Sequence, residues 1–107
     1  APVDSFAGVA ETTSRSEHTT PAVTTASSGT WAVSYWADKT SATTAWTPPA
    51  GQTVRAGSYG AGGGRITSLA VDNAAAQPAG TYGSLTATAN SASKNATMWT
   101  ILLAPHA

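Results

Sequence analysis

The stretch from Gly29 to Pro49, GTWAVSYWADKTSATTAWTPP, combines three of the chain's four tryptophans with almost no charge. Indole rings can stack on the apolar face of a sugar, whose hydroxyl groups then need carboxylate, amide or guanidinium partners. Trp36 alternates with polar neighbours, and Trp46 stands at a strand end, just before two prolines. Trp36 therefore lies either under a loop or on a face open to water, and in the second case we expect Trp36 and Trp46 to be stacking surfaces.

Polar residues that could anchor such a ligand lie near these rings in the sequence. The candidate ligand-binding residues are Trp36, Trp46, Asp38, Lys39, Arg55 and Tyr59. Lys39 has a plainer alternative, which is to pair with Asp38 or to cap a sheet edge. The other aromatic residues of the strands, Trp31, Tyr35 and Trp99, share a face with aliphatic residues, so we expect them in the core.

Metal and phosphate sites find little support in the sequence. Asp72 and Asn73 could hold Ca²⁺, which prefers hard oxygen ligands, but no other cofactor is expected. His18 and His106 have no local cluster of further ligands. The glycine run Gly60–Arg65 leads into a strand rather than a helix, so it predicts a hairpin connection and not a phosphate loop.

The residues that catalysis would need are scarce. The chain has no cysteine and no GxSxG motif, and its five carboxylates are scattered. Asp38 and Asp72 could meet only through folding, and a 107-residue chain has little mass left to build a cleft around them. We expect no enzymatic activity.

Turn residues recur every 10–15 positions, and β-prone runs fill the intervals, as in a sandwich or barrel. We expect one domain over residues 1–107, all-β, with two antiparallel sheets in a jelly-roll-like sandwich. The eight expected strands span residues 2–11, 17–25, 30–38, 43–47, 52–59, 64–72, 80–89 and 95–104. The last contains MWTILLAP, apolar on both faces, which predicts a central strand or one covered on both sides.

Charge and hydropathy limit the partners. Five basic and five acidic residues give a net charge near zero without a basic cluster, so nucleic acid is not an expected partner. No run approaches 18 apolar residues, so no membrane span is expected. The first residues lack a charged start and an apolar run, so we expect the numbering to begin after processing or at a domain boundary.

Several segments together resemble a known type of domain. They are HTTP, TWAVSYWADKTSATTAWTPP, VRAGSYGAGGGRITSLAVD and ATMWTILLAP, within residues 17–105. The chain resembles an uncharacterised β-rich accessory domain of large secreted actinobacterial proteins, often found beside PKD-like or lectin-like modules. The resemblance implies an extracellular location and no catalytic residues to carry over.

Two functions follow as expectations. The first is a secreted, non-catalytic module that binds polysaccharide or cell-surface glycan, or mediates adhesion, with Trp36 and Trp46 as its rings. The alternative is a structural subunit or spacer of a surface fibre, phage particle or other assembly, packed against identical copies. Exposed sheet edges, which another chain can complete, favour the second.

Overall fold

The computed structural model describes residues 2–62 and 64–104, and these residues form ten strands and no helix. The strands are β1 (Val3–Ala10), β2 (Arg15–Thr19), β3 (Val23–Thr25), β4 (Thr30–Lys39), β5 (Trp46–Thr47), β6 (Thr53–Ser58), β7 (Ile66–Gln77), β8 (Gly80–Tyr82), β9 (Thr86–Ser93) and β10 (Ala96–Leu103). The prediction of an all-β chain is confirmed. No helix of the described residues is long and apolar enough to cross a membrane.

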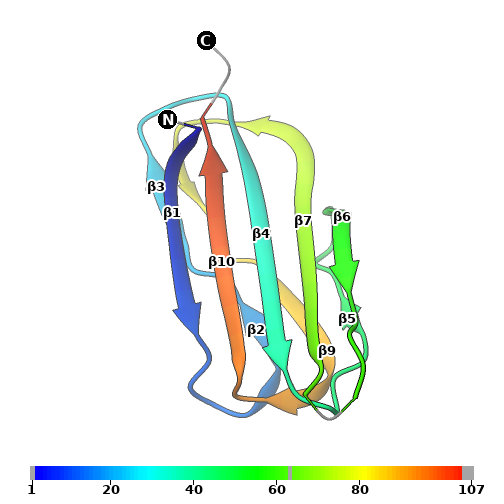
Figure 1. Ribbon diagram of the computed structural model, residues 1–107. Helices are drawn as coiled ribbons and strands as arrows, with labels where there is room; N and C mark the ends of the chain where they lie inside the picture. Colours follow the sequence, from blue (N-terminus) through cyan, green and yellow to red (C-terminus); the bar gives the residue numbers. More distant parts are fainter. Residues whose placement is uncertain (1, 63, 105–107) are drawn as a thin grey trace.

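The strands pair into three antiparallel sheets. The largest has the order β1-β10-β4-β7-β6, and the smaller ones have the orders β2-β9-β5 and β3-β8. In Figure 1 the long strands of the five-stranded sheet run side by side, and the smaller sheets lie behind it. β10 lies between β1 and β4, so the prediction of a central last strand is confirmed.

Two of the eight predicted strands are each divided in two, which gives ten. Residues 17–25 separate into β2 and β3 around Pro21, whose nitrogen has no hydrogen to donate to a ladder. Residues 80–89 separate into β8 and β9 at Gly83, which has a φ of 100°. A Cβ at Gly83 would lie 3.0 Å from the carbonyl oxygen of Pro21, so the two breaks face each other. Turn residues inside a β-prone run therefore ended each strand early.

Two strands run several residues further than the sequence predicts: β9 ends at Ser93 rather than at residue 89, and β7 is extended further still. β7 was expected to end at residue 72, but it continues to Gln77 through three alanines. It pairs with β4 as far as Thr30, with a register shift between Trp31 and Val33. Cross-strand pairing outweighs the low strand propensity of alanine here.

The core lies between the five-stranded sheet and the smaller sheets. Its main cluster consists of Trp36, Trp46, Leu69, Val71, Ala87, Ala89, Ala96 and Met98, and a second cluster consists of Val23, Ala32 and Leu102. Small hydroxyl residues on the same inward faces are also buried, among them Thr67 and Thr100. The inward face of the large sheet is thus a mixture of a few large apolar side chains and many small polar ones.

Candidate functional site

Trp36 and Trp46, the two expected stacking residues, are core residues. Their exposed fractions are 0% and 7%. The indole Nε1 of Trp36 donates to the backbone oxygen of His18 at 2.9 Å, and that of Trp46 donates to Oγ1 of Thr67 at 2.9 Å. Both rings have their polar atom satisfied inside the protein, so the expectation that they face water is wrong.

The expected polar anchors do not gather around one site either. Asp38 is buried and accepts hydrogen bonds from Thr43 at 2.8 Å and Ser93 at 2.7 Å, so it joins the β4–β5 connection and the end of β9 to β4. Lys39 is exposed at the end of β4. Tyr59 is exposed, and its hydroxyl would lie 3.4 Å from a Cβ at Gly57. Gly57 pairs with the buried Leu69, so the Tyr59 hydroxyl lies on the side of the sheet opposite to Trp31.

The exposed rings lie on the other face of the five-stranded sheet, which we call the outer face. Trp31 and Trp99 are each 37% exposed, Phe6 is 62% exposed, and Tyr35 is half-buried. The expectation that Trp31, Tyr35 and Trp99 fill the core is therefore wrong.

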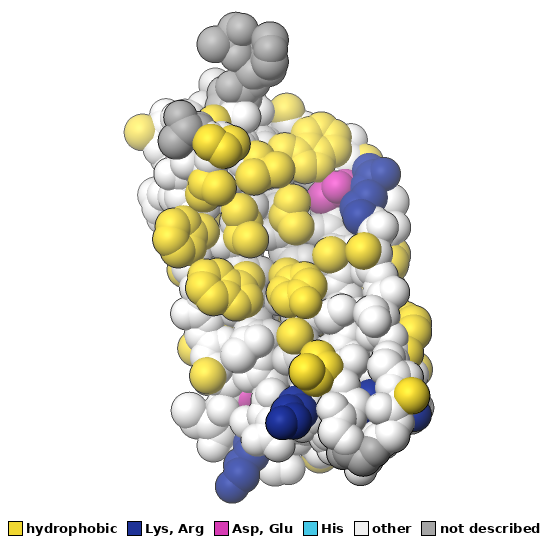
Figure 2. Space-filling model, in the orientation of Figure 1, with side chains coloured by type: hydrophobic (Ala, Val, Ile, Leu, Met, Phe, Trp, Pro, Cys, Tyr) yellow, Lys and Arg dark blue, Asp and Glu magenta, His cyan; other side chains and the backbone are white. Residues whose placement is uncertain are grey.

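Directly opposed residues in an antiparallel ladder share a face, which places these rings with aliphatic neighbours. The outer face of β1, β10 and β4 is formed by Val3, Phe6, Gly8, Trp99, Ile101, Leu103, Trp31, Val33 and Tyr35. Figure 2 shows these hydrophobic side chains gathered over the three strands.

Three of the rings form a row across the sheet, which we call the ring row: Phe6, Trp99 and Tyr35. Tyr35 pairs with Trp99, and Trp99 pairs with Gly8. A Cβ at Gly8 would lie 2.6 Å from the Trp99 ring, so the indole lies directly over the glycine backbone. Phe6 stacks beside it, with ring centroids 6.2 Å apart and planes inclined by 29°. The missing side chain at Gly8 lets the indole lie along the sheet, which leaves its other side to solvent.

A polar cluster borders the outer face at Asp72, on β7. Arg55 donates to both carboxylate oxygens, from Nε at 2.8 Å and from Nη2 at 3.1 Å. Trp31 Nε1 donates at 3.0 Å, and the backbone amide of Ala74 donates at 2.7 Å. The Arg55 hydrogen bonds, with the Trp31 and Ala74 bonds, lower the pKa of Asp72 to about 2 despite its burial. We call Asp72, Arg55 and Trp31 the Asp72 site.

The expected calcium residues have other partners. Asp72 is held as described, and the side-chain oxygen of Asn73 accepts a hydrogen bond from Gln77 at 2.9 Å. Among residues 2–62 and 64–104, no group of three or more His, Cys, Asp or Glu side chains could hold a metal ion. His106 lies outside the described residues.

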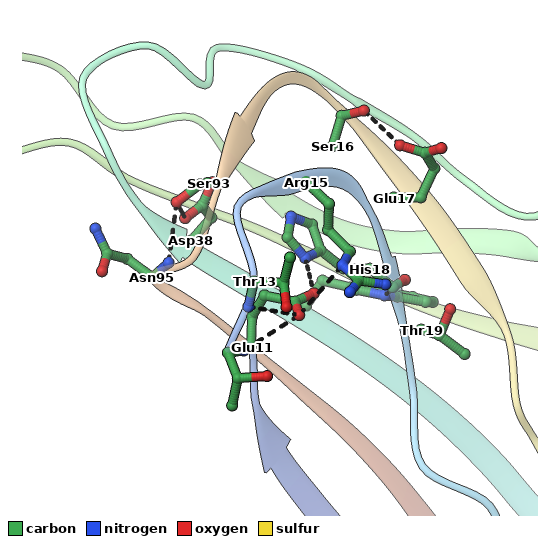
Figure 3. A network of polar contacts seen from close by, with 12 residues as sticks. Glu11, Thr13, Arg15, Ser16, Glu17, His18, Thr19, Asp38, Ser93 and Asn95 are labelled. Carbon is green, nitrogen blue, oxygen red and sulfur yellow. Dashed lines mark hydrogen bonds and ion pairs between the residues drawn. The ribbon is translucent and has the colours of Figure 1, made fainter.

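A second polar network closes the end of the molecule near the β1–β2 connection (Figure 3). Glu11 accepts from Nδ1 of the fully buried His18 at 2.7 Å and lies 3.4 Å from Nε of Arg15. Burial opposes ionisation of Glu11, but its bonds with His18, Thr13 and Arg15 outweigh it and lower the pKa. A carboxylate bonded to an imidazole also occurs in acid–base catalytic sites. Because the imidazole is fully buried, however, the pair joins the connection to β2 rather than facing solvent.

Comparisons with protein-family models, curated proteins and solved structures give no match to this chain. The account of function therefore depends on the geometry of the described residues.

Sequence reasoning missed the outer face because alternation shows which residues share a face but not which face is inward. Two signals in the sequence favour the observed choice. Gly8 stands in a strand where a glycine indicates close approach of another group. The Asp38 position near Trp36 can be buried because Thr and Ser hydroxyls are abundant enough to bond its carboxylate.

Proposed function

We propose that this chain is a secreted, non-catalytic accessory module that binds a polysaccharide or cell-surface glycan through its outer face. The observation that supports the proposal is the ring row, in which Phe6, Trp99 and Tyr35 stand on three adjacent strands. The resemblance to accessory domains of secreted proteins is the reason for the extracellular location. We further propose that the sheets form a jelly-roll-like sandwich, with the five-stranded sheet as one complete layer.

The shape of the outer face favours an extended ligand. Neighbouring strands lie about 4.8 Å apart, so three rings on three strands span about 10 Å across the sheet. The described residues enclose no pocket, so a small sugar would find no concave site there. A polymer with a flat apolar face can lie across the three rings and exclude water from both surfaces.

Self-association is the second candidate, and the aliphatic part of the outer face favours it. Val3, Ile101 and Leu103 lie together at one end of β1 and β10. An exposed apolar face of this kind is also typical of a surface that another copy covers, as in a fibre or a particle. The two candidates predict different behaviour in solution.

The test is depletion of the protein from solution by insoluble cellulose and chitin. We expect the wild-type protein to be retained and Trp99→Ala to bind at least about tenfold more weakly, since a buried ring at an interface is worth more than 1.4 kcal/mol. The matched control is Val9→Ala, because Val9 is exposed on β1, the strand that carries Phe6, but pairs with the buried Met98. Equal retention of Trp99→Ala and Val9→Ala would refute the ring row. A wild-type oligomer in light scattering, with no retention on either polymer, would favour assembly instead.

A further inference from the structure

Asp72 holds two exposed side chains on the outer face in fixed positions. Its carboxylate is 6% exposed and binds the guanidinium of Arg55 with two parallel hydrogen bonds. The same carboxylate fixes the indole of Trp31 through Nε1. A planar cation and an aromatic ring are therefore oriented by one buried acid, which reduces the freedom that each would lose on binding a ligand.

The backbone around Asp72 is irregular on both sides. The β4–β7 ladder shifts register between Trp31 and Val33, and the β6–β7 ladder shifts between Val54 and Ala56. Ala74, two residues further along β7, has a φ of 58° and donates its amide to Asp72. A left-handed alanine costs about 1–2 kcal/mol, and bulges of this kind often redirect side chains beside functional sites.

Arg55 keeps donors for a ligand after binding Asp72. Its bonds to the carboxylate use Nε and one N–H of Nη2, which leaves the two N–H groups of Nη1 and the second N–H of Nη2. The Arg55 side chain is 52% exposed, and Trp31 is exposed beside it. Because Asp72 compensates the charge of Arg55, the site offers hydrogen bonds without a net charge.

We propose that the Asp72 site binds one sugar unit of a neutral polysaccharide, with Trp31 stacked on the sugar ring and Arg55 Nη1 donating to its hydroxyl groups. This inference rests on the proposed function and names its ligand class. Trp31 and Tyr35 are four residues apart on β4, about 13 Å along the strand. A chain lying along β4 would therefore contact the Asp72 site and the ring row together. The low pKa of Asp72 keeps the site assembled above about pH 4.

The experiment is a titration of ¹⁵N-labelled protein with cellohexaose and chitohexaose, followed through the indole N–H signals. Trp31→Phe and Trp99→Phe assign the two relevant signals. We expect both to shift in the wild-type protein. We expect Arg55→Ala to raise the dissociation constant about tenfold, as for loss of a hydrogen bond to a charged donor. Arg55→Lys, which keeps the charge without the fork, should also bind more weakly. The control is Val54→Ala, an exposed neighbour that pairs with the buried Val71.

The outcomes separate this inference from the proposed function. The inference is wrong if the Trp99 signal shifts while the Trp31 signal does not, and Arg55→Ala binds as tightly as Val54→Ala. The Asp72 site would then only connect β6, β7 and β4. If neither signal shifts with either hexamer, the proposed function fails as well. Tighter, salt-dependent binding to polygalacturonate would overturn the choice of a neutral ligand. Should Arg55→Ala fail to fold, Arg55→Lys provides the same comparison.

Discussion

Gly8 is the position where one added methyl group tests the geometry of the outer face. A Cβ there would lie 2.6 Å from two carbon atoms of the Trp99 indole and 2.7 Å from a third. Carbon atoms in contact stay about 3.5–4.0 Å apart, so in Gly8→Ala the ring must move by about 1 Å. Such overpacking costs about 1–3 kcal/mol, while replacing glycine in a strand returns about 0.5–1 kcal/mol. We therefore expect the free energy of unfolding of Gly8→Ala to be about 0.5–2 kcal/mol lower than that of the wild-type protein.

Gly57→Ala is the matched control, because Gly57 also stands in an edge strand of the same sheet. Its nearest neighbour would be the Tyr59 hydroxyl at 3.4 Å, which is the end of an adaptable side chain. We expect this variant to be as stable as wild type or up to about 1 kcal/mol more stable. Urea unfolding followed by circular dichroism measures both. If Gly8→Ala is as stable as Gly57→Ala, and still binds polysaccharide, the indole does not lie on the glycine backbone.

Three further predictions concern the interior and the polar clusters. Trp36→Phe should lower the free energy of unfolding by about 2–4 kcal/mol, because it leaves a cavity and an unpaired backbone oxygen at His18. A loss below about 0.5 kcal/mol, measured by urea unfolding, would contradict the burial of Trp36. The lowered pKa of Asp72 contributes stability above about pH 4 that is lost as the pH falls toward 2, by at most about 2 kcal/mol after screening at Arg55. Asp72→Asn should remove this loss of stability between pH 4 and pH 2. Acid-unfolding curves of Asp72→Asn and the wild-type protein that run parallel would refute the contribution of Asp72. Glu11→Ala should lower the free energy of unfolding by about 1–3 kcal/mol, because it leaves Nδ1 of the buried His18 imidazole unpaired. An unchanged thermal unfolding temperature would show that the network in Figure 3 does not contribute to stability.

The strand pattern was largely predictable from the sequence, and the face that each strand buries was not. The β4 residues alternate as expected, with Trp31, Val33 and Tyr35 on one side and Ser34, Trp36 and Asp38 on the other. Hydrophobicity alone favours burial of the first set. The protein buries the second. Other segments bond the indole N–H of Trp36 and the carboxylate of Asp38, and these partners are apparent only in the folded chain.

The candidate site shows the same limit. Arg55 was expected as a polar anchor and Asp72 as a possible calcium ligand, but no sequence pattern pairs them across β6 and β7 or joins them to Trp31. Their meeting depends on two register shifts, and a shift of one residue turns a side chain to the opposite face. Residue types therefore indicated the available chemistry, whereas the bulges determined which residues share a site.

Hydroxyl-radical footprinting of the four tryptophans, with and without insoluble cellulose or chitin, examines both the orientation of the large sheet and the role of its outer side. In the free protein we expect oxidation at Trp31 and Trp99 and little at Trp36 and Trp46, in line with their exposures of 37%, 37%, 0% and 7%. On the polymer, Trp31 and Trp99 should become protected. Oxidation of Trp36 as fast as that of Trp99, or no protection of Trp99 in protein retained by the polymer, would contradict the account.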